Sequence, residues 1–529
     1  MLYYFLYLLI VLYVSFVTKR SLHMLQQNLY NENNRYLNWV NSNYKTTLVN
    51  YLYFAILLSV LGLFFKNISS LFIILIMILY IISYVRESNI NLSNQNKKPL
   101  VITARIKRLI ITHIIIYALI IVLGILFNRN DIALVALTVL STFSFYTTFL
   151  SLIINTPIEK LIYKHFENMA KNKLSSMKNL KVIGITGSYG KTSCKNILND
   201  ILSIKFNTLS TPKSLNTFNG LMITINNQLD KFDDVFIAEM GAYVRGEING
   251  LCDLVNPKYG IITSIGTAHL KTFGSEENIQ KGKMELIEHL PSDGVGVLNR
   301  DDEKQANYNI KNSCKIIWIG IESKDVDFRA VNIKTKGIKT TFDIEIAKEG
   351  KKYEFETKLL GKHNIYNILS AVALGYELGI SVKDLHLAVK RFKSIEHRLE
   401  LKKIGNFYQI DDAYNSNPIG AKNALEVLSN MDGYRVVVTP GMIELGNKEY
   451  EYNFEFGKQI GEISNADLVI LVGKKQTKPI MDGLIKSGYD KDKIMIINDV
   501  RQSYTIINNL KLKDVYALYE NDLPDTYNE

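Results

Sequence analysis

Cysteine is scarce in this chain, and its spacing excludes two kinds of stabilising site. The 529 residues contain only three cysteines, Cys194, Cys252 and Cys314, and none belongs to a Cys-x-x-Cys pair. An odd number of widely separated thiols cannot close a disulfide framework, and this set lacks the paired spacing of a structural zinc site. The cysteine pattern therefore fits a protein of a reducing compartment.

The pattern of a nucleic-acid-binding protein is also missing. The formal net charge is +11 at pH 7, but no basic stripe with interleaved aromatic residues occurs beyond about residue 180. Much of the positive charge lies beside long apolar segments instead, where basic residues orient helices in a bilayer. We therefore expect no nucleic-acid partner.

What the sequence does contain is a change of composition along its length. Residues up to about 155 are dominated by Leu, Ile, Tyr, Phe and Val, whereas polar and apolar runs alternate beyond about 180, as in a soluble α/β protein. A chain of 529 residues is too long for one core. The sequence therefore predicts two or three domains, with an apolar first part followed by α/β structure.

Five apolar segments of the first part are candidate membrane spans. They are Leu2–Val17, Leu48–Phe65, Leu71–Val85, Leu109–Phe127 and Ile132–Ile154. The first and third are short for a full span, so a count of four stays open. The first has no basic N-terminal region and no small-residue cleavage site, and further spans follow it, which favours a retained helix over a signal peptide. Five such runs in succession also argue against buried helices of a soluble protein.

Basic residues predict the orientation of these spans. They cluster after the first segment (Lys19, Arg20, Arg35, Lys45) and after the third (Arg86, Lys97, Lys98, Arg105, Lys107, Arg108), whereas the other connections offer only Lys66 and Arg129. The positive-inside rule then places the N-terminus outside and both basic loops in the cytoplasm. With an odd number of spans, everything after Ile154 is cytoplasmic. The stretch 157–179 reads as a juxtamembrane linker helix, with Ile158, Leu161, Ile162 and Phe166 near helical spacing, or equally as a solvated linker.

A glycine-rich turn follows the first strand pattern of the second part. Val182–Thr186 is a buried-strand pattern, Gly187-Ser188-Tyr189-Gly190-Lys191-Thr192 comes directly after it, and Ser193–Leu202 is helical in character. A strand, a glycine turn and a helix N-terminus form an anion cradle, because glycines admit backbone N–H groups to a phosphate and the helix dipole favours negative charge. We expect Lys191 to reach the β- and γ-phosphates of ATP and Thr192 to hold Mg²⁺. The alternative is a tight turn with a surface lysine.

This loop departs from the general Gly-x4-Gly-Lys-Ser/Thr form, because Ile185 occupies its first position. It resembles instead the loop of the Mur ligases and their folylpolyglutamate synthetase relatives. Two further stretches follow in the family's order. Asp234–Gly241 resembles the strand whose glutamate, here Glu239, binds Mg²⁺, and Thr263–Leu270 resembles the stretch whose histidine, here His269, binds a second Mg²⁺.

The resemblance also implies a modified lysine. Lys283 follows His269 by fourteen residues, where the family has a lysine that is carbamylated by CO₂. Carbamylation turns a cation into an anionic oxygen ligand for a hard divalent metal. Lys281 is a nearby competitor for this role, and an exposed helix lysine is the structural alternative.

Further matches concern the nucleotide. Four segments resemble nucleotide-contacting motifs of the family: Val297–Asp302, Gly361–Asn367, His397–Glu400 and Asp411–Pro418. The resemblance implies that one residue of each contacts ATP, in the same order Asn299, Asn364, Arg398 and Asp412. Ile443–Gly446 is another family-like segment. Helix capping is a structural alternative for Asn364 and for Asn367. With Gly187, Ser188, Gly190, Lys191 and Thr192, these residues form the expected nucleotide site.

The resemblance covers roughly residues 180–510 and implies the fold. We expect an α-helical transmembrane bundle followed by α/β structure, made of a central P-loop ATPase domain and a Rossmann-like C-terminal domain. The expected boundaries are 1–156 for the bundle, 157–179 for the linker, 180–397 for the central domain and 398–529 for the C-terminal domain. Among the branches of the family, the motifs look most like the one that adds D-alanyl-D-alanine in peptidoglycan synthesis.

Two departures from the family limit what can be carried over. Membrane segments occupy the place of the domain that holds the UDP end of the substrate, so the carboxylate acceptor could be lipid-linked or polymeric. The family branch usually closes with a Lys-Gly-Ser-Arg loop, whereas Tyr516–Asp525 is acidic here. An acidic segment at a substrate-facing edge suggests a different incoming amine, possibly a cationic one, although an acidic terminal tail is the default alternative.

Together these features predict a membrane-anchored ligase that releases ADP. ATP would phosphorylate a carboxylate, and an amino acid or dipeptide amine would attack the acyl phosphate to form an amide. Lys191, His269 and Lys283 are the predicted catalytic residues, with Thr192 and Glu239 at one Mg²⁺ and His269 and carbamylated Lys283 at the second. Two alternatives remain, a poly-γ-glutamate-type polymer synthetase and a nucleotide-switched membrane scaffold without ligase activity.

Overall fold

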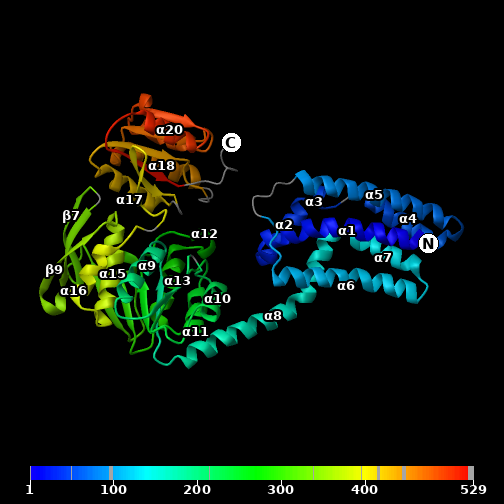
Figure 1. Cartoon of the computed structure of the whole chain (residues 1–529), viewed down its shortest axis with the longest axis horizontal. Helices are drawn as coiled ribbons and strands as arrows, with labels where there is room; N and C mark the ends of the chain where they lie inside the picture. Colours follow the sequence, from blue (N-terminus) through cyan, green and yellow to red (C-terminus); the bar gives the residue numbers. More distant parts are fainter. Residues whose placement is uncertain are drawn as a thin grey trace. The chain divides into compact units, whose positions relative to one another are not determined.

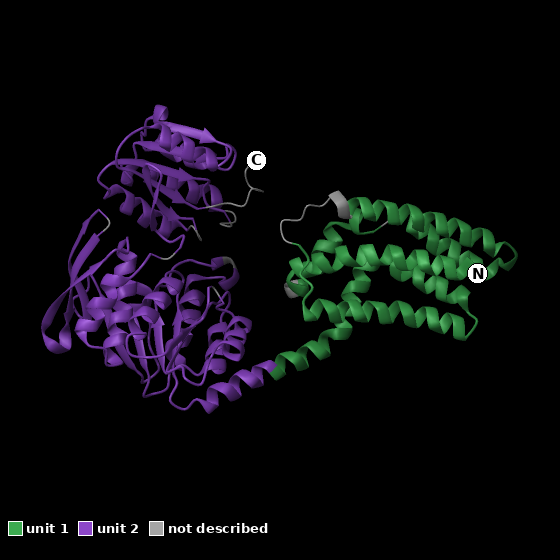
Figure 2. Ribbon diagram, viewed as in Figure 1, with its two compact units in different colours: residues 1–165 green, residues 166–529 purple. Residues whose placement is uncertain are grey.

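The protein consists of two compact units, residues 1–165 and 166–529 (Figures 1 and 2). The structure, a computed structural model, describes residues 2–48, 51–93, 99–213, 215–337, 339–394, 396–413, 417–443 and 448–521. The change of composition seen in the sequence coincides with the change of architecture, because the first unit is helical and the second is α/β.

The first unit contains apolar helices joined by short connections. Its elements are α1 (Leu2–Gln27), η1 (Leu29–Asn34), α2 (Arg35–Ser42), α3 (Tyr44–Thr47), α4 (Leu52–Phe64), η2 (Lys66–Ile68), α5 (Ser69–Ser93), α6 (Ala104–Leu126), α7 (Asn130–Thr142) and the first part of α8 (Ser144–Ser176). Helix α1 packs against α5 and α7, and α4 packs against α5 and α7. Many large apolar side chains nevertheless remain exposed on these helices, for example Phe5, Ile82 and Ile114. Exposed apolar surface of this extent suits an apolar surrounding better than water.

Three helices are long and apolar enough to cross a membrane, namely α1, α5 and α6. The two runs that looked short in the sequence form complete helices, since α1 and α5 continue through polar residues to 26 and 25 residues. The expectation of five continuous spans is not met by the other two apolar runs. Helix α4 has only 13 residues, and the run Ile132–Ile154 is broken between α7 and α8, which are bent by 94° relative to each other. If the bent pair counts as one span, the described residues contain four candidates.

Several polar side chains inside the helical unit are paired across helices. The hydroxyls of Ser21 and Thr148 lie 2.6 Å apart, and those of Ser59 and Thr138 lie 3.0 Å apart. Arg20 forms an ion pair with Glu87 at 2.7 Å. Such pairing is required because unpaired polar groups are costly away from water.

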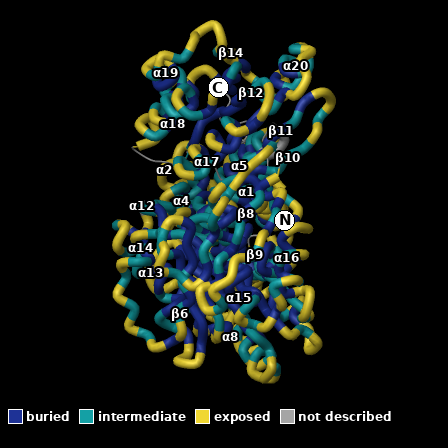
Figure 3. The backbone as a smooth tube through the Cα atoms, turned by 90° about the vertical axis from the view of Figure 1, so that its left-hand side faces the viewer, coloured by how far each residue is buried: buried dark blue, intermediate teal, exposed yellow. Residues whose placement is uncertain are grey.

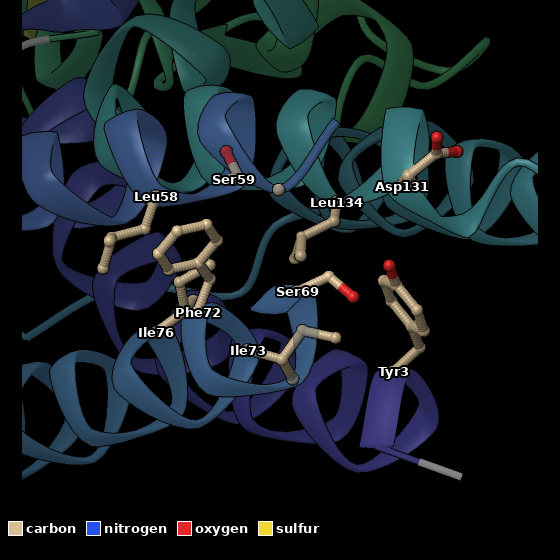
Figure 4. Close-up of a pocket in the computed structure, with 10 residues that line it drawn as sticks. Tyr3, Leu58, Ser59, Ser69, Phe72, Ile73, Ile76, Asp131 and Leu134 are labelled. Atoms are coloured by element: carbon tan, nitrogen blue, oxygen red, sulfur yellow. The ribbon is translucent and has the colours of Figure 1, made fainter. Parts of the chain in front are cut away.

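A small cavity lies near one end of the helical unit. Figure 4 shows its lining, which includes Tyr3, Ser59, Phe72 and Asp131 from α1, α4, α5 and α7. Its volume of about 10 Å³ is comparable with the space of a single water molecule. This cavity is too small for a substrate.

The second unit begins with a nine-stranded sheet in the order β2-β3-β1-β4-β5-β6-β7-β8-β9. Its strands are β1 (Lys181–Thr186), β2 (Thr208–Ser210), β3 (Val235–Glu239), β4 (Tyr259–Ile262), β5 (Val295–Asn299), β6 (Lys315–Gly320), β7 (Phe328–Lys336), β8 (Lys339–Ile346) and β9 (Lys351–Thr357). The pairs from β2 through β7 are parallel, whereas β7, β8 and β9 form antiparallel pairs. Strands β3 and β5 are buried on both faces, which explains their nearly continuous apolar sequences.

Helices cover both faces of this sheet and enclose two apolar cores. These helices are α9 (Lys191–Leu202), α10 (Phe218–Asn227), α11 (Glu247–Val255), α12 (Leu270–Phe273), α13 (Glu276–His289), α14 (Glu303–Ala306), α15 (Lys362–Glu377) and α16 (Val382–Arg391), with η3 (Ala347–Glu349) in a connection. Residues of α9, α15 and α16 form one core with the sheet, and residues of α10, α11 and α13 form the other. The central strands β3, β4 and β5 are accordingly almost entirely buried, and Figure 3 shows how buried and exposed residues are distributed along the chain.

A second, six-stranded sheet follows, in the order β10-β11-β15-β12-β13-β14. Its elements are β10 (Glu400–Ile404), β11 (Phe407–Asp412), α17 (Pro418–Ser429), β12 (Tyr434–Thr439), α18 (Glu449–Ile463), β13 (Leu468–Val472), α19 (Lys478–Lys486), η5 (Lys491–Lys493), β14 (Ile494–Ile497), α20 (Arg501–Asn509) and β15 (Val515–Glu520). Among the described strands of this second sheet, only the edge pair β10 and β11 is antiparallel. This is the doubly wound sheet expected for the C-terminal domain.

The stretch 157–179 is not a separate linker helix, because it belongs largely to α8. This 33-residue helix contains Pro157 and ends at Ser176. Its last turns join the second unit: Ala170 is fully buried in the core on the α10 side, and the Lys173 ammonium donates to the Ile225 carbonyl at 3.0 Å. The helix therefore continues from the apolar unit into the α/β unit without a break.

Candidate active site

The glycine turn lies between β1 and α9, as the sequence predicts. Gly187 and Gly190 both have positive φ, at +149° and +80°. A Cβ on Gly187 would lie 2.1 Å from the Thr263 hydroxyl, and one on Gly190 would lie 2.9 Å from the Asn367 amide oxygen. Both positions therefore need glycine, for backbone conformation and for space.

The glycine turn is hydrogen bonded to a neighbouring loop, and the Lys191 side chain folds back onto the turn. The Ser188 backbone N–H donates to the Ser264 carbonyl at 2.7 Å. The Lys191 ammonium donates to the carbonyls of Gly187 at 2.8 Å and Ser188 at 3.2 Å. Burial lowers the pKa of Lys191 to about 8, a net shift that the nearby Glu239 carboxylate opposes and the Arg398 charge supports. Lys191 thus places a cation at the loop that an anionic phosphate would occupy.

Thr192 and Glu239 meet beside the loop. The Thr192 hydroxyl donates to Glu239 Oε1 at 3.2 Å, and the Asn216 amide donates to the same oxygen at 3.1 Å. Glu239 is only 1% exposed, and Lys195 lies 3.1 Å from its Oε2. The carboxylate at the end of β3 and the hydroxyl at the start of α9 are therefore brought together from strand and helix ends 47 residues apart.

This pair fits a magnesium ion. Carboxylate and hydroxyl oxygens are the hard ligands that Mg²⁺ prefers, usually as one or two protein ligands with phosphate oxygens completing the shell. The buried Glu239 Oε2 already lies 3.1 Å from the Lys195 ammonium, so the environment of this carboxylate accepts a cation. The described residues contain no cluster of three or more His, Cys, Asp or Glu side chains that could hold a metal by themselves. A metal here would thus depend on the nucleotide for ligands.

Lys283 is buried, whereas its competitor Lys281 is not. The Lys283 side chain is 2% exposed, and its ammonium donates to the Ala242 carbonyl at 3.3 Å. Burial and the nearby Lys191 charge lower the pKa of Lys283 to about 7, so much of it is a neutral amine near neutral pH. Lys281 is 43% exposed and forms an ion pair with Glu277 at 2.5 Å. Of the two, Lys283 has the environment of a reactive amine.

His269 is exposed at the N-terminal end of α12, in the left-handed region at φ +59°. Its ring lies against Tyr243, with 4.4 Å between the ring centroids. Lys283 contacts Ala242, the residue before Tyr243, and its ammonium lies 5.4 Å from the ring of Phe273 in α12. His269 and Lys283 thus approach the same short segment, and their assignment to a second metal stays a prediction.

A cavity of about 390 Å³ adjoins the glycine turn. It is formed between the first sheet's domain and the second sheet's domain, and Gly190 lies in its wall. Four predicted nucleotide residues, which come from four separate sequence blocks, also line it: Asn299, Asn364, Arg398 and Asp412. A cavity of this size beside an anion cradle can hold a nucleotide.

Two of these residues also shape the wall. The Asn299 side chain accepts a hydrogen bond from the Asp301 backbone N–H at 3.0 Å. Asn364 donates to the Leu360 carbonyl at 2.7 Å and accepts a hydrogen bond from Asn367 at 3.3 Å. The capping alternative for Asn364 and Asn367 is thus compatible with their place in the wall, because both face the cavity as well.

The acidic turn after β5 organises the same wall. Burial raises the pKa of Asp301, but hydrogen bonds from Ser323, Ile321 and Glu322 outweigh it and lower this pKa to about 2. Asp302 accepts a hydrogen bond from the Ile265 backbone N–H at 2.7 Å. Both carboxylates therefore tie the turn to neighbouring loops.

The second domain contributes a pair of acids. Asp412 at the end of β11 is in register with Glu520 at the end of β15, and their carboxyl groups are hydrogen bonded. Burial raises the pKa of Asp412 to about 6, against the lowering effects of the Leu399 N–H and Arg398. Glu520 is fully buried and lines the cavity, so the acidic C-terminal segment is not simply a frayed tail at this residue. Its continuation, 522–525, lies outside the described residues, as do residues 414–416 and 444–446 of two family-like motifs.

Sequence reasoning missed two partners of the predicted site, the buried Lys195 and the partly buried Asn216. Lys195 had a detectable signal, because it falls on the apolar face of α9 with Leu198 and Leu202. A lysine on a core-facing position needs a buried acceptor. Asn216 had no such signal, since it lies in an irregular loop.

Comparison with known proteins gives consistent matches. The sequence profile of the Mur ligase middle domain matches residues 185–375, and that of the Mur ligase glutamate ligase domain matches residues 397–518. A UDP-N-acetylmuramoyl-tripeptide–D-alanyl-D-alanine ligase from Bacillus subtilis is 31% identical over 331 residues, which cover 62% of this chain and 70% of that protein. The Escherichia coli protein of the same name is 31% identical over 56% of this chain and 65% of its own length. The chain thus spans about two thirds of these relatives.

Solved structures agree with the fold. MurF from Acinetobacter baumannii is 25% identical with a TM-score of 0.61, and the match covers 67% of this chain and 77% of that one. MurF from Thermotoga maritima, solved with ADP, is 23% identical with a TM-score of 0.61 over 69% of this chain and 81% of that one. The profile matches begin at residue 185, after the apolar helices.

Proposed function

Because this chain belongs to the Mur ligase family of ATP-dependent, amide-bond-forming enzymes, we propose that it adds D-alanyl-D-alanine, or a related amino acid or dipeptide, to a peptidoglycan precursor. The observation that carries the proposal is the cavity in which Asn299, Asn364, Arg398 and Asp412 meet the glycine turn. The names of the Bacillus and Escherichia relatives support the choice of amine and acceptor.

The proposed reaction has two steps. An acceptor carboxylate attacks the γ-phosphorus of ATP, which forms an acyl phosphate and releases ADP. The amine then attacks the acyl carbon, so that an amide forms, phosphate leaves and a proton is lost from nitrogen. The barrier of the first step is lowered mainly by positioning and by stabilising the charge on the transferring group.

The glycine turn supplies both effects. Its backbone N–H groups and the N-terminal end of α9 favour the phosphate charge, and Lys191 exchanges its two carbonyl partners for phosphate oxygens. Arg398 and Asp412 hold the nucleotide from the second domain. Because both domains line the cavity, binding also excludes water, which would otherwise hydrolyse an acyl phosphate.

Mg²⁺ is proposed at Thr192 and Glu239. The metal neutralises charge on the phosphates when bound. Glu239 Oε2 and the Thr192 hydroxyl offer the protein oxygens, while Asn216 keeps the carboxylate oriented through Oε1.

Carbamylation of Lys283 is part of the proposal. The neutral amine attacks CO₂, a C–N bond forms and one proton is released, which leaves an anionic oxygen pair on the side chain. The lowered pKa of Lys283 supports this, because only the neutral amine reacts. The carbamate and His269 would complete a second Mg²⁺ site.

We further propose that the helical unit holds the enzyme at the cytoplasmic face of a membrane. Helices α1, α5 and α6 are long and apolar enough to span it. An acceptor that is itself lipid-linked or polymeric would then be concentrated at the same surface. Neither the poly-γ-glutamate alternative nor the non-enzymatic scaffold has a supporting observation, and family membership argues against the scaffold.

The phosphate-cradle role is tested with Lys191→Ala. We expect ADP release to fall by at least about a hundredfold, which corresponds to roughly 3 kcal/mol of lost transition-state stabilisation. The melting temperature should remain near that of the parent. Lys205→Ala is the matched control, because Lys205 also donates to two backbone carbonyls but from an exposed site. Near-normal ADP release by Lys191→Ala would contradict the assignment.

A further inference from the structure

Lys195 is a buried lysine that the proposed mechanism does not use. It lies one helical turn after Lys191 on α9 and is 2% exposed. Its ammonium donates hydrogen bonds to the carbonyls of Thr211 at 2.6 Å and Lys213 at 2.7 Å. It also forms an ion pair with Glu239 Oε2 at 3.1 Å.

Lys195 therefore connects three parts of the site. Helix α9 carries it, the segment after β2 supplies the two carbonyls, and the end of β3 supplies Glu239. The same segment is joined to Glu239 a second time, because the Glu239 backbone N–H donates to the Thr211 hydroxyl at 3.1 Å. These contacts fix the carboxylate before any ligand arrives.

A buried carboxylate without a compensating cation is strongly destabilising. Mg²⁺ would provide such a cation only while it is bound. Lys195 provides a positive charge that is part of the protein itself and is present beside Glu239 whether or not Mg²⁺ is bound. The same charge repels a metal that approaches Oε2, since like charges a few ångströms apart interact strongly in a buried site.

We propose that Lys195 is a positioning residue that acts as the permanent counter-cation of Glu239, keeping the carboxylate aligned with Thr192 between turnovers and weakening Mg²⁺ binding so that the metal exchanges with the nucleotide. This inference rests on the proposed Mg²⁺ site. It predicts an unusual outcome, in which removing a residue of the site makes metal binding tighter. The reason is linkage: loss of the ammonium destabilises the Mg²⁺-free state more than the Mg²⁺-bound state.

The test measures the melting temperature of the full-length protein in detergent, with saturating ADP, as a function of Mg²⁺ concentration. Lys195→Gln keeps hydrogen-bond donors for the two carbonyls but removes the charge. We expect a lower melting temperature without Mg²⁺ and a Mg²⁺ midpoint at least about fivefold below that of the parent. Lys195→Arg retains the charge and should keep the midpoint within about twofold of the parent.

Lys205→Gln is the matched control, because the Lys205 ammonium also donates to two backbone carbonyls but lies far from Glu239 in sequence. It should leave the midpoint unchanged whatever its effect on stability. A midpoint for Lys195→Gln equal to or above that of the parent overturns the proposal, since a purely structural lysine would give this result. If Lys195→Gln is unfolded without metal, Mg²⁺ and ADP together should recover it, and failure to do so also overturns the proposal.

Glu239→Gln separates this inference from its premise. It should abolish the Mg²⁺ response of the parent. If the response persists in Glu239→Gln, or if the parent shows none, the proposed metal site itself is wrong and the role of Lys195 falls with it. If Glu239→Gln behaves as expected while Lys195→Gln does not, only the role of Lys195 is wrong.

Discussion

The lysines near the glycine turn differ in burial and in what their ammonium groups contact. Lys191 and Lys283 lose proton affinity through burial, and the positive charge of Lys191 adds to the effect on Lys283. Lys195 has a carboxylate neighbour instead. Lys281, two residues from Lys283, is exposed and paired with Glu277. Similar side chains therefore have different expected chemistry within a few residues of sequence.

The burial of Lys283 makes a prediction about pH. Its pKa of about 7 lies below that of an ordinary lysine, so the neutral amine predominates above pH 7 and is lost as the pH falls below it. At limiting bicarbonate, activity should therefore decline below about pH 7 and recover when more bicarbonate is added. The measurement is ADP release against pH at two bicarbonate concentrations. A pH profile that is insensitive to bicarbonate contradicts the carbamate.

Chemical rescue tests the same residue independently. Lys283→Ala should lose most activity and regain part of it with added short-chain carboxylic acids, which can supply the missing oxygens. Lys281→Ala should remain active and show no response to the acids. Absence of rescue would count against a carbamate at Lys283.

Single residues also show where sequence reasoning is sufficient. The family resemblance points to Glu239 at a strand end and Thr192 at a helix start, and the structure brings their side chains within 3.2 Å of each other. Lys283 was preferred over Lys281 from the register with His269, and burial supports that preference. Asn216 could not be predicted, because its approach to Glu239 depends on the path of an irregular loop.

Among the elements, the turn between β1 and α9 makes a sharp prediction. Gly190→Ala adds a Cβ 2.9 Å from the Asn367 amide oxygen at φ +80°. We expect ADP affinity to fall by about tenfold or more, because backbone strain and the clash together should cost roughly 1.4 kcal/mol or more of ADP binding free energy. Calorimetric titration with ADP measures the effect.

Gly488→Ala is the control for backbone strain. Gly488 has nearly the same φ, +79°, but no atom lies within 4 Å of a Cβ there. It should lower stability by about 1 kcal/mol without changing ADP affinity. Equal ADP affinity in both variants would contradict the role of the Gly190 turn.

Helix α8 makes a prediction about the membrane. At 100° per residue, Ile158 and Met169 lie on one face, whereas Lys160 and Lys171 lie on the opposite face. Ile158 and Met169 are 47% and 44% exposed in this structure, and a helix with apolar and basic faces can lie in a lipid interface.

Fluorescent labels on single cysteines at these four positions test the prediction in the full-length protein, in vesicles containing anionic lipid. The three native cysteines are free but buried, which favours labelling of the introduced one. Labels in Ile158→Cys and Met169→Cys should be quenched by brominated lipid, and those in Lys160→Cys and Lys171→Cys by aqueous iodide. Equal quenching at all four positions contradicts an interfacial α8.

The helices also show why the number of spans could not be predicted from the apolar runs alone. Helix α1 continues beyond its apolar run because Thr18 and Ser21 are buried against other helices. The last run contains no glycine or proline at the break between α7 and α8, so the 94° bend has no local signal in the sequence. Both effects come from packing within the bundle.

At the scale of the whole molecule, the division into an apolar and an α/β unit follows directly from composition. The two sheets follow from strand and helix patterns together with the family resemblance. The shape of the cavity between the two domains could not be predicted from the sequence, because its wall combines residues as far apart as Gly190 and Glu520. Proximity of residues so distant in the chain is a property of the fold.

We propose that the full chain couples ATP to amide formation on a cell-wall precursor. The most direct measurement is ADP release by detergent-purified full-length protein with Mg²⁺ and bicarbonate, with UDP-linked or lipid-linked muropeptides as acceptors and D-alanyl-D-alanine or other amines. We predict that ADP release requires an acceptor and an amine together and that the product contains the new amide. ATP turnover that needs neither, or no turnover with any acceptor and amine, would contradict the account.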